Sequence, residues 1–225
     1  GFNAWGERFR PYDRDAAVGA LIARRLGDEV RSVPMVLEGG SITCDGAGTL
    51  LTTEQCLLNP NRNPSLSREQ IESILLERLG VDRVLWLGKG LIEDRDTDGH
   101  VDLIAAFTGP GRTLLQTVGP ENPNYENCQE TLRRLADAAV DVIEMPYLAY
   151  VQVAGETIGA SYMNLYVCNG AVLVPVFGVH DDSDALAVIA RAYPGREVVP
   201  VPGSLLAYGG GGPHCITQQV PSRDA

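Results

Sequence analysis

The sequence lacks several features that would place the protein in other classes. No apolar run approaches the roughly 20 residues of a membrane-spanning helix. The first residues carry neither the basic nor the apolar stretch of a secretory signal, so a cytoplasmic protein is expected. Basic residues are in deficit, since 18 Lys and Arg face 29 Asp and Glu, giving a net charge of −11. This charge argues against nucleic acid or an anionic membrane as a partner and favours a small cationic molecule.

Cysteine pairs are also missing. The five cysteines form no CxxC pair and no metal-ligand spacing, and the odd number fits a reducing compartment. Three of them adjoin apolar segments and are expected to be small buried hydrophobic residues: Cys56, Cys128 and Cys168. Only Cys215 has glycine-rich, polar surroundings.

What the sequence does contain is a repeat. Apolar spacing predicts a first helix over 14–26 and a strand over 32–37. Thereafter the order strand, strand, helix, strand occurs three times, with helix starts separated by roughly 60 residues. The three units cover 41–87, 101–145 and 161–201 within a single catalytic domain, 1–225. Their predicted elements are 41–44, 49–53, 67–79 and 83–87; 101–107, 113–118, 126–138 and 140–145; and 162–168, 171–177, 183–192 and 197–201.

The residues with chemical potential occupy matching places in the repeat. Glu38 precedes the first unit, His100 and Asp102 open the second, Ser161 precedes the third, and Cys215 follows the last strand. If the units pack around a central axis, these places meet at one site. On a strand, the spacing of His100 and Asp102 would turn both side chains to the same face.

Cys215 follows the four glycines 209–212, which suit a loop whose backbone passes close to a ligand. Two interpretations of this cysteine stand side by side: a thiolate nucleophile presented to a substrate, and an incidental thiol in a flexible loop. Adjacent residues of an extended segment point to opposite faces, so His214 is not expected to be the base for Cys215.

A calcium loop is a competing interpretation. The run Asp94-x-Asp96-x-Asp98-Gly99 matches the opening of such a loop, whose twelfth position should be a bidentate Glu. That position is Ala105, and no flanking helices are predicted, so a calcium loop is not expected. Weak ion binding by the aspartates remains an alternative.

Five motifs together resemble one family in order along the chain. They are Glu38-Gly39-Gly40-Ser41, the run 57–64 (LLNPNRNP), Asp98-Gly99-His100-Val101-Asp102, Ser161-Tyr162-Met163-Asn164, and His214-Cys215-Ile216-Thr217-Gln218-Gln219. On these motifs the chain is similar to the agmatine deiminases of the guanidine-modifying superfamily. The resemblance implies the pentein fold, an α/β propeller of five blades, of which the three units are complete blades.

The resemblance also implies a reaction: agmatine and water give N-carbamoylputrescine and ammonia, a step of putrescine biosynthesis. Cys215 would attack the guanidinium carbon, His100 would transfer protons, and Asp102 and Glu38 would hold the guanidinium or orient His100. Asp96 would face the distal ammonium of the substrate, and Gly212 would line the substrate site. No metal and no organic cofactor is implied, and an oligomer of identical chains is expected.

The chain departs from the family pattern in two ways. The family carries a further guanidinium-binding aspartate upstream of the segment that begins here at Gly1, so the resemblance implies an enzyme without its N-terminal portion, a segment that would complete the propeller. Pro213 stands where a branched apolar residue is usual. The alternatives are therefore deimination of peptidyl-arginine or arginine, and a catalytically incomplete fragment that binds a guanidine or acts as an interaction module.

Overall fold

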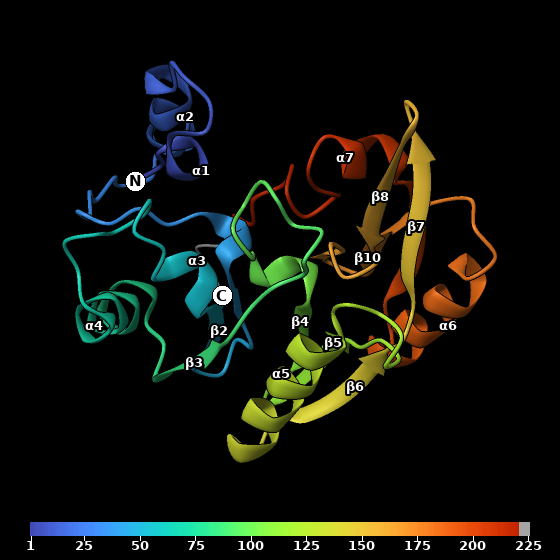
Figure 1. The fold of residues 1–225 in the computed structure, drawn as a ribbon. Helices are drawn as coiled ribbons and strands as arrows, with labels where there is room; N and C mark the ends of the chain where they lie inside the picture. Colours follow the sequence, from blue (N-terminus) through green and yellow to red (C-terminus); the bar gives the residue numbers. More distant parts are fainter. Residues whose placement is uncertain (221–225) are drawn as a thin grey trace.

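The computed structural model describes residues 1–220, in which the strands form small separate sheets (Figure 1). The first unit consists, in chain order, of β1 (Ile42–Cys44), β2 (Thr49–Thr53), α4 (Arg68–Leu79) and β3 (Arg83–Leu87). β2 is the central strand, antiparallel to β1 and parallel to β3. A parallel pair needs a crossover connection, and α4 supplies it.

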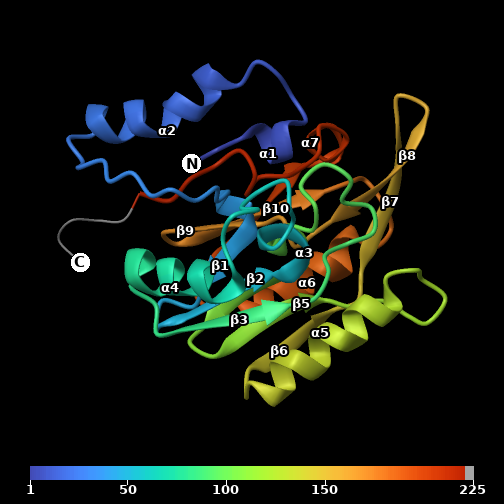
Figure 2. The same ribbon diagram turned by 60° about the vertical axis from the view of Figure 1, so that its left-hand side comes forward.

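Two further units repeat this arrangement. The second contains β4 (Ala105–Gly109), β5 (Arg112–Gln116), α5 (Tyr125–Asp137) and β6 (Asp141–Met145). The third contains β9 (Tyr166–Cys168), β10 (Ala171–Val176), α6 (Asp182–Ala192) and β11 (Glu197–Pro202). Strand pairing is the same as in the first unit, and each helix lies on the outer side of its own sheet (Figures 1 and 2). The predicted order of strand, strand, helix, strand is therefore confirmed in all three units.

The start of α4 shows how a local signal determines an element boundary. The Ser67 hydroxyl accepts a hydrogen bond from the backbone N–H of Gln70, and the Gln70 side chain accepts one from the backbone N–H of Ser67. This reciprocal capping satisfies two of the backbone donors that a helix start leaves free. Gly80, with φ of 64°, then ends the helix in the left-handed conformation.

Three predicted strands are corrected by the structure. The segment 32–37 is irregular. The side-chain amide of Asn63 accepts a hydrogen bond from the N–H of Val36 and donates one to its C=O, so these groups do not pair with a neighbouring strand. The predicted strand 101–107 opens instead with the 3-10 turn η2 (Val101–Leu103), after a reversal at Gly99. The predicted strand 162–168 begins only at β9, because the Ser161 hydroxyl accepts from the N–H of Met163 and turns the chain.

Elements outside the three units complete the described part of the chain. They are α1 (Ala4–Glu7), α2 (Asp13–Arg25), the 3-10 turn η1 (Gly39–Ser41), α3 (Glu54–Leu57), β7 (Leu148–Val153), β8 (Glu156–Ser161) and α7 (Ser204–Tyr208). β7 and β8 form an antiparallel hairpin that the sequence analysis did not predict. Helix α2 contains no buried residue and lies at the edge of the molecule (Figures 1 and 2).

Three apolar clusters and several polar contacts hold the units together. The first cluster surrounds α4. The second lies between β4, β5 and α5 and includes Leu51 and Leu87 of the first unit, and the third lies between α6, β10 and the β7–β8 hairpin and includes Leu114 and Met145 of the second unit. The hydroxyl of Thr53 donates to the C=O of Gly99, and that of Ser161 donates to the C=O of Leu103. These two contacts hold the turn that opens the second unit between its neighbours. No helix among the described residues is long and apolar enough to cross a membrane.

Candidate functional site

The structure brings together side chains from three of the four matching places in the repeat. Glu38 ends the irregular segment before η1, His100 and Asp102 stand at the start of η2, and Cys215 lies in a turn after α7. Nε2 of His100 is 3.9 Å from Oε2 of Glu38. Sγ of Cys215 is 3.5 Å from Oδ2 of Asp102. The first three side chains are almost fully buried, whereas Cys215 is exposed.

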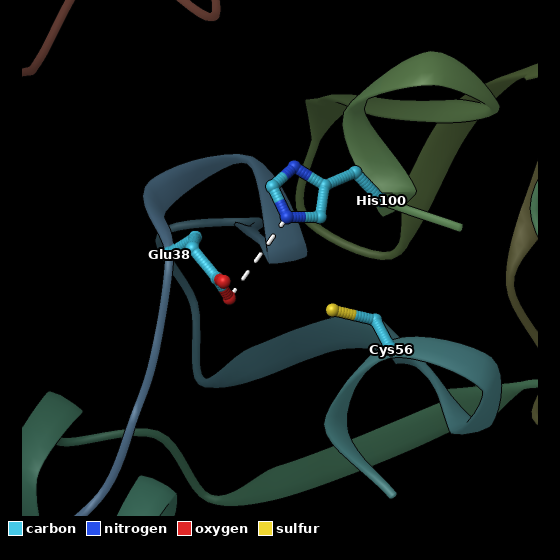
Figure 3. A group of neighbouring side chains, drawn as sticks. All are labelled: Glu38, Cys56 and His100. Carbon is cyan, nitrogen blue, oxygen red and sulfur yellow. Dashed lines mark ion pairs between the residues drawn. The ribbon is translucent and has the colours of Figure 1, made fainter. Parts of the chain in front are cut away.

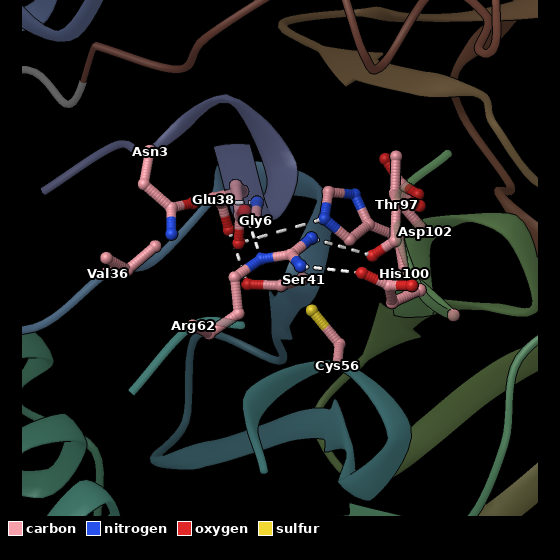
Figure 4. A network of polar contacts seen from close by, with 12 residues as sticks. Asn3, Gly6, Val36, Glu38, Ser41, Cys56, Arg62, Thr97, His100 and Asp102 are labelled. Carbon is pink, nitrogen blue, oxygen red and sulfur yellow. Dashed lines mark hydrogen bonds and ion pairs between the residues drawn. The ribbon is translucent and has the colours of Figure 1, made fainter. Parts of the chain in front are cut away.

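A buried arginine fixes one side of this site. Arg62, whose side chain is 0% exposed, donates from Nε to Oε1 of Glu38 at 2.7 Å. Its Nη1 donates to Oδ2 of Asp98 at 2.7 Å, and its Nη2 donates to the C=O of Thr97 at 3.0 Å (Figure 4). One guanidinium thus joins Glu38 to the loop that leads into His100. A guanidinium suits this task because its five donors stand in a rigid, planar arrangement.

The charges of this cluster set the protonation of His100. Burial alone would lower the pKa of His100, but Cys56, Glu38 and the charge of Asp102 outweigh it and raise that pKa to about 10. Burial alone would raise the pKa of Glu38, but His100 and Arg62 lower it below its ordinary value. At neutral pH the pair is therefore an imidazolium and a carboxylate. The imidazolium can therefore act as a general acid within the site.

Asp102 and Asn164 hold the segment that carries the thiol. Oδ2 of Asp102 accepts from Nδ1 of His214 at 2.9 Å, beside Sγ of Cys215. The side chain of Asn164 donates from Nδ2 to Sγ at 3.1 Å and accepts the N–H of Cys215 at Oδ1 at 3.2 Å. The expectation that His214 and Cys215 point to opposite faces is wrong. Residues 213–216 form a turn rather than an extended strand, so both side chains reach Asp102.

The Asp102 carboxylate also bears on the reactivity of the thiol. Although the residue is partly open to solvent, protein atoms packed around its sulfur remove water from it, and this desolvation and the charge of Asp102 raise the pKa of Cys215 to about 12. Hydrogen bonds from the backbone N–H of Gly212 and the amide of Asn164 partly oppose the shift. The resting group at neutral pH is therefore the thiol. A cation placed against Asp102 would neutralise the charge that opposes ionisation and would favour the thiolate.

Unpartnered polar atoms are concentrated in this site. Among the described residues, four buried side-chain N or O atoms lack a hydrogen-bond partner: Glu38 Oε2, His100 Nε2, Asp102 Oδ1 and Thr117 Oγ1. All except the last belong to the site. Buried polar atoms without partners destabilise a fold, so a group of them indicates that a ligand supplies the missing contacts.

The backbone comes unusually close to these side chains at one glycine. A Cβ added to Gly40 would stand 2.5 Å from Oδ2 of Asp102 and 2.6 Å from Nδ1 of His100. Both distances are impossible for a real side chain, so only glycine lets η1 approach the start of η2. This close approach explains the Glu38-Gly39-Gly40 motif in physical terms.

The three aspartates of the acidic loop do different things. Asp94 accepts hydrogen bonds from the backbone N–H groups of Thr97, Gly99 and His100, and so shapes the loop. Asp98 pairs with Arg62. The calcium interpretation therefore gains no support, since the loop aspartates form no metal-binding group among residues 1–220.

Asp96 is half-exposed, and its carboxylate lies 3.7 Å from the guanidinium of Arg8. It lines a cavity of about 240 Å³ whose wall also contains Gly210–Gly212, three further acidic residues (Glu93, Asp94 and Glu156) and the basic residue Arg95. Gly212 is thus a cavity residue, and its role in substrate binding stays a prediction. Gly211, also in its wall, lies against Cys215, because a Cβ there would be 2.7 Å from Sγ. The cavity therefore borders the glycine loop that contacts the thiol, and its wall contains several carboxylates.

Three residues of the site were not predicted from the sequence. Cys56 was expected as a small buried hydrophobic residue; it is buried, but it also faces His100 (Figure 3). Arg62 and Asn164 stood inside quoted motifs without a role. The run 57–64, polar and proline-rich beside an apolar segment, was the available signal for Arg62. Its partners, 24 and 36 residues away, could not be read from spacing.

The buried ion pair of Arg62 and Glu38 should contribute measurably to the free energy of unfolding. Arg62→Met should lower the free energy of unfolding by about 3–5 kcal/mol, because it leaves a buried carboxylate without its partner. The matched control is Arg78→Met, which removes a half-exposed pair with Glu77 and should cost about 0–1 kcal/mol. Denaturant unfolding measures both. Equal losses in the two variants would contradict this role of Arg62.

Comparison with known proteins gives consistent results. Residues 1–221 match the family described as Porphyromonas-type peptidyl-arginine deiminase. An agmatine deiminase of Pseudomonas fluorescens is 40% identical over an alignment of 252 positions, gaps included. The alignment covers 99% of this chain and 68% of that protein. An agmatine deiminase of Stutzerimonas stutzeri is 41% identical over an alignment of 251 positions, which covers 98% of this chain and 68% of that protein. The chain thus spans about two thirds of the length of these relatives.

Solved structures agree with the sequence relatives. The agmatine deiminase of Enterococcus faecalis superposes with a TM-score of 0.91 at 37% identity, over 99% of this chain and 68% of that one. A substrate-bound C315S agmatine deiminase of C. jejuni gives 0.89 at 30% identity, over 96% and 65%. A DDAH from Pseudomonas aeruginosa superposes with a TM-score of 0.52 at 20% identity. This likeness shows a common fold only, and the fold is of the pentein type. The chain belongs to the Porphyromonas-type peptidyl-arginine deiminase family, which is the guanidine-modifying relationship that its motifs predict.

Proposed function

We propose that this chain carries the active site of an agmatine deiminase, which hydrolyses agmatine to N-carbamoylputrescine and ammonia. The observation that supports the proposal best is the pairing of an exposed thiol with a buried carboxylate. Cys215 lies 3.5 Å from Asp102, whose Oδ1 has no hydrogen-bond partner among the described residues. A guanidinium is planar, cationic and rich in donors, so it can satisfy that oxygen while its carbon faces the sulfur.

Substrate binding activates the nucleophile in this proposal. The guanidinium neutralises the charge of Asp102, which lowers the pKa of Cys215 and lets the thiol proton leave to solvent. Because the thiol is exposed, its proton has a direct route out. The side-chain amide of Asn164 hydrogen-bonds the sulfur and keeps it in place for attack.

His100 then acts first as an acid and afterwards as a base. The thiolate attacks the guanidinium carbon, the imidazolium of His100 protonates one amino group, and ammonia leaves from the tetrahedral species. An amidino-thioether on Cys215 remains. Neutral His100 next takes a proton from water as the oxygen bonds to the same carbon. Collapse of this second tetrahedral species breaks the carbon–sulfur bond and releases the carbamoyl product and the thiolate, while the hydroxyl proton passes to solvent. Glu38 holds His100 in place and supports its positive charge.

The acidic cavity gives the proposal its substrate preference. Agmatine carries a second positive charge at the end distant from the guanidinium, and the cavity beside the glycine loop of Cys215 is lined by four acidic residues, Glu93, Asp94, Asp96 and Glu156, against one basic residue, Arg95. Free arginine would bring an additional carboxylate into these acidic surroundings, which is unfavourable. Deimination of peptidyl-arginine remains the second candidate, because the family description names that substrate class. The expected cellular setting is cytoplasmic putrescine synthesis.

Mass spectrometry of the purified protein with agmatine tests the covalent mechanism. Cys215→Ser should lower ammonia release by at least about a thousandfold, because it removes the nucleophile. His100→Ala should retain a covalent adduct on Cys215, because its hydrolysis then lacks a base; turnover should fall by about 10²–10⁴-fold. Absence of both adduct and ammonia in the unsubstituted protein would instead favour the guanidine-binding fragment without activity.

A second prediction concerns Asp96. Asp96→Asn should lower kcat/KM for agmatine by roughly 2–5-fold, since a half-exposed charge pair contributes about 0.5–1 kcal/mol. Activity toward an alkylguanidine without the distal ammonium should not change. Asp184→Asn, at an exposed position on α6, is the matched control and should affect neither substrate. An equal loss for both substrates would contradict contact between Asp96 and the ammonium. Turnover of arginine and of an arginyl peptide in the same assay would identify the preferred guanidine.

A further inference from the structure

A second group of side chains lies behind the guanidinium site. Cys56 on α3, His100 before η2 and Glu38 before η1 turn their side-chain ends toward one another (Figure 3). Sγ of Cys56, a ring nitrogen of His100 and a carboxylate oxygen of Glu38 all lie within 4.8 Å of one another. All three residues are buried, and Cys56 is 0% exposed. The proposed reaction uses His100 and Glu38 but gives no task to the Cys56 thiol.

We propose that Cys56, His100 and Glu38 form a binding site for a thiophilic divalent cation, Zn²⁺, whose occupation blocks the reaction. Binding itself follows from the geometry of the three residues. The blocking effect rests on the proposed function, because it follows from the roles of His100 and Glu38 in deimination. A bound ion would occupy Nε2 of His100 and Oε2 of Glu38, so the imidazole could no longer be held by Glu38 as the imidazolium that the reaction needs.

The donor atoms are those that zinc prefers. One sulfur, one imidazole nitrogen and one carboxylate oxygen are each common ligands of this ion. Two of the atoms, His100 Nε2 and Glu38 Oε2, have no hydrogen-bond partner among the described residues. Arg62 binds the other carboxylate oxygen of Glu38, Oε1, and so leaves Oε2 free toward the cluster.

The distances are close to those of a coordinated ion. Zinc bonds of about 2.0–2.3 Å place two ligand atoms roughly 3.3–3.8 Å apart in tetrahedral geometry. Nε2 of His100 and Oε2 of Glu38 are already 3.9 Å apart. Small side-chain rotations therefore suffice to close the site.

The charges of the donor groups also suit a buried site. A thiolate and a carboxylate together balance the two positive charges of Zn²⁺, so the bound ion leaves no uncompensated charge.

The test measures zinc binding in a Cys215→Ser background, which removes the exposed thiol and any turnover. Equilibrium dialysis against Zn²⁺ should give one tight site per chain. Adding Cys56→Ser should weaken zinc binding by more than about 100-fold. Loss of a residue that only supports a ligand weakens metal binding by about 10–100-fold, and Cys56 is a direct ligand in this proposal. Adding Cys128→Ser, another buried thiol, should leave the affinity unchanged.

X-ray absorption of the zinc-bound Cys215→Ser protein provides an independent readout if Cys56→Ser fails to fold. One sulfur at about 2.3 Å is expected, with nitrogen and oxygen completing the shell. A shell without sulfur, equal affinity with and without Cys56, or no bound zinc would each overturn the proposal. In the protein with Cys215 intact, Zn²⁺ should inhibit ammonia release and a chelator should restore it. Failure of the unsubstituted protein to hydrolyse agmatine would overturn the proposed function while leaving the binding result intact.

Discussion

The site depends on a guanidinium buried with its carboxylates. Arg62 is fully enclosed, and its donors reach Glu38, Asp98 and a backbone oxygen of the loop between them. Placing an ion in the interior is unfavourable unless its hydrogen bonds are satisfied, and here three separate acceptors satisfy them. The arrangement orients one oxygen of Glu38 and leaves the other directed at His100. Through Glu38, Arg62 helps to keep the imidazole positively charged.

The same site leaves some of its own polar atoms unsatisfied. Asp102 has one oxygen bound by His214 and the other without a partner, and its charge keeps the nearby Cys215 protonated. In the proposed reaction, a cationic substrate completes the hydrogen bonds of Asp102 and favours the thiolate. Cys215 would then be activated by the molecule that it attacks, and this exposed cysteine would stay protonated in the absence of substrate. The cost in stability is offset by the three apolar clusters, two of which span neighbouring units.

Much of the fold could be predicted because its signals are local. The capping box at Ser67 and the apolar faces of the helices each act within a few residues, and the repeat fixes their order. The β7–β8 hairpin was missed because its turn contains Ala154, a non-glycine residue with positive φ that no turn pattern indicates. The irregular course of 32–37 depends on Asn63, a partner 27 residues away.

The candidate site could be predicted only in part, for the same reason. Cys215, His100, Asp102 and Glu38 were selected by their equivalent places in the repeat, and the structure brings them together. The contacts of Arg62 and Cys56 depend on tertiary packing, so spacing gave no indication of them. His214 was assigned to the wrong face because a two-residue alternation holds for strands and fails in a turn.

The central claim is that the buried network keeps His100 positively charged at neutral pH. Nuclear magnetic resonance of the protein with isotope-labelled histidine tests it directly, because the chain contains only 3 histidines and substitution of His180 and of His214 assigns the signals. The account predicts that the His100 ring remains protonated through neutral pH and titrates at about 10. Titration of His100 near its ordinary value of 6.5, or below it, would contradict the account.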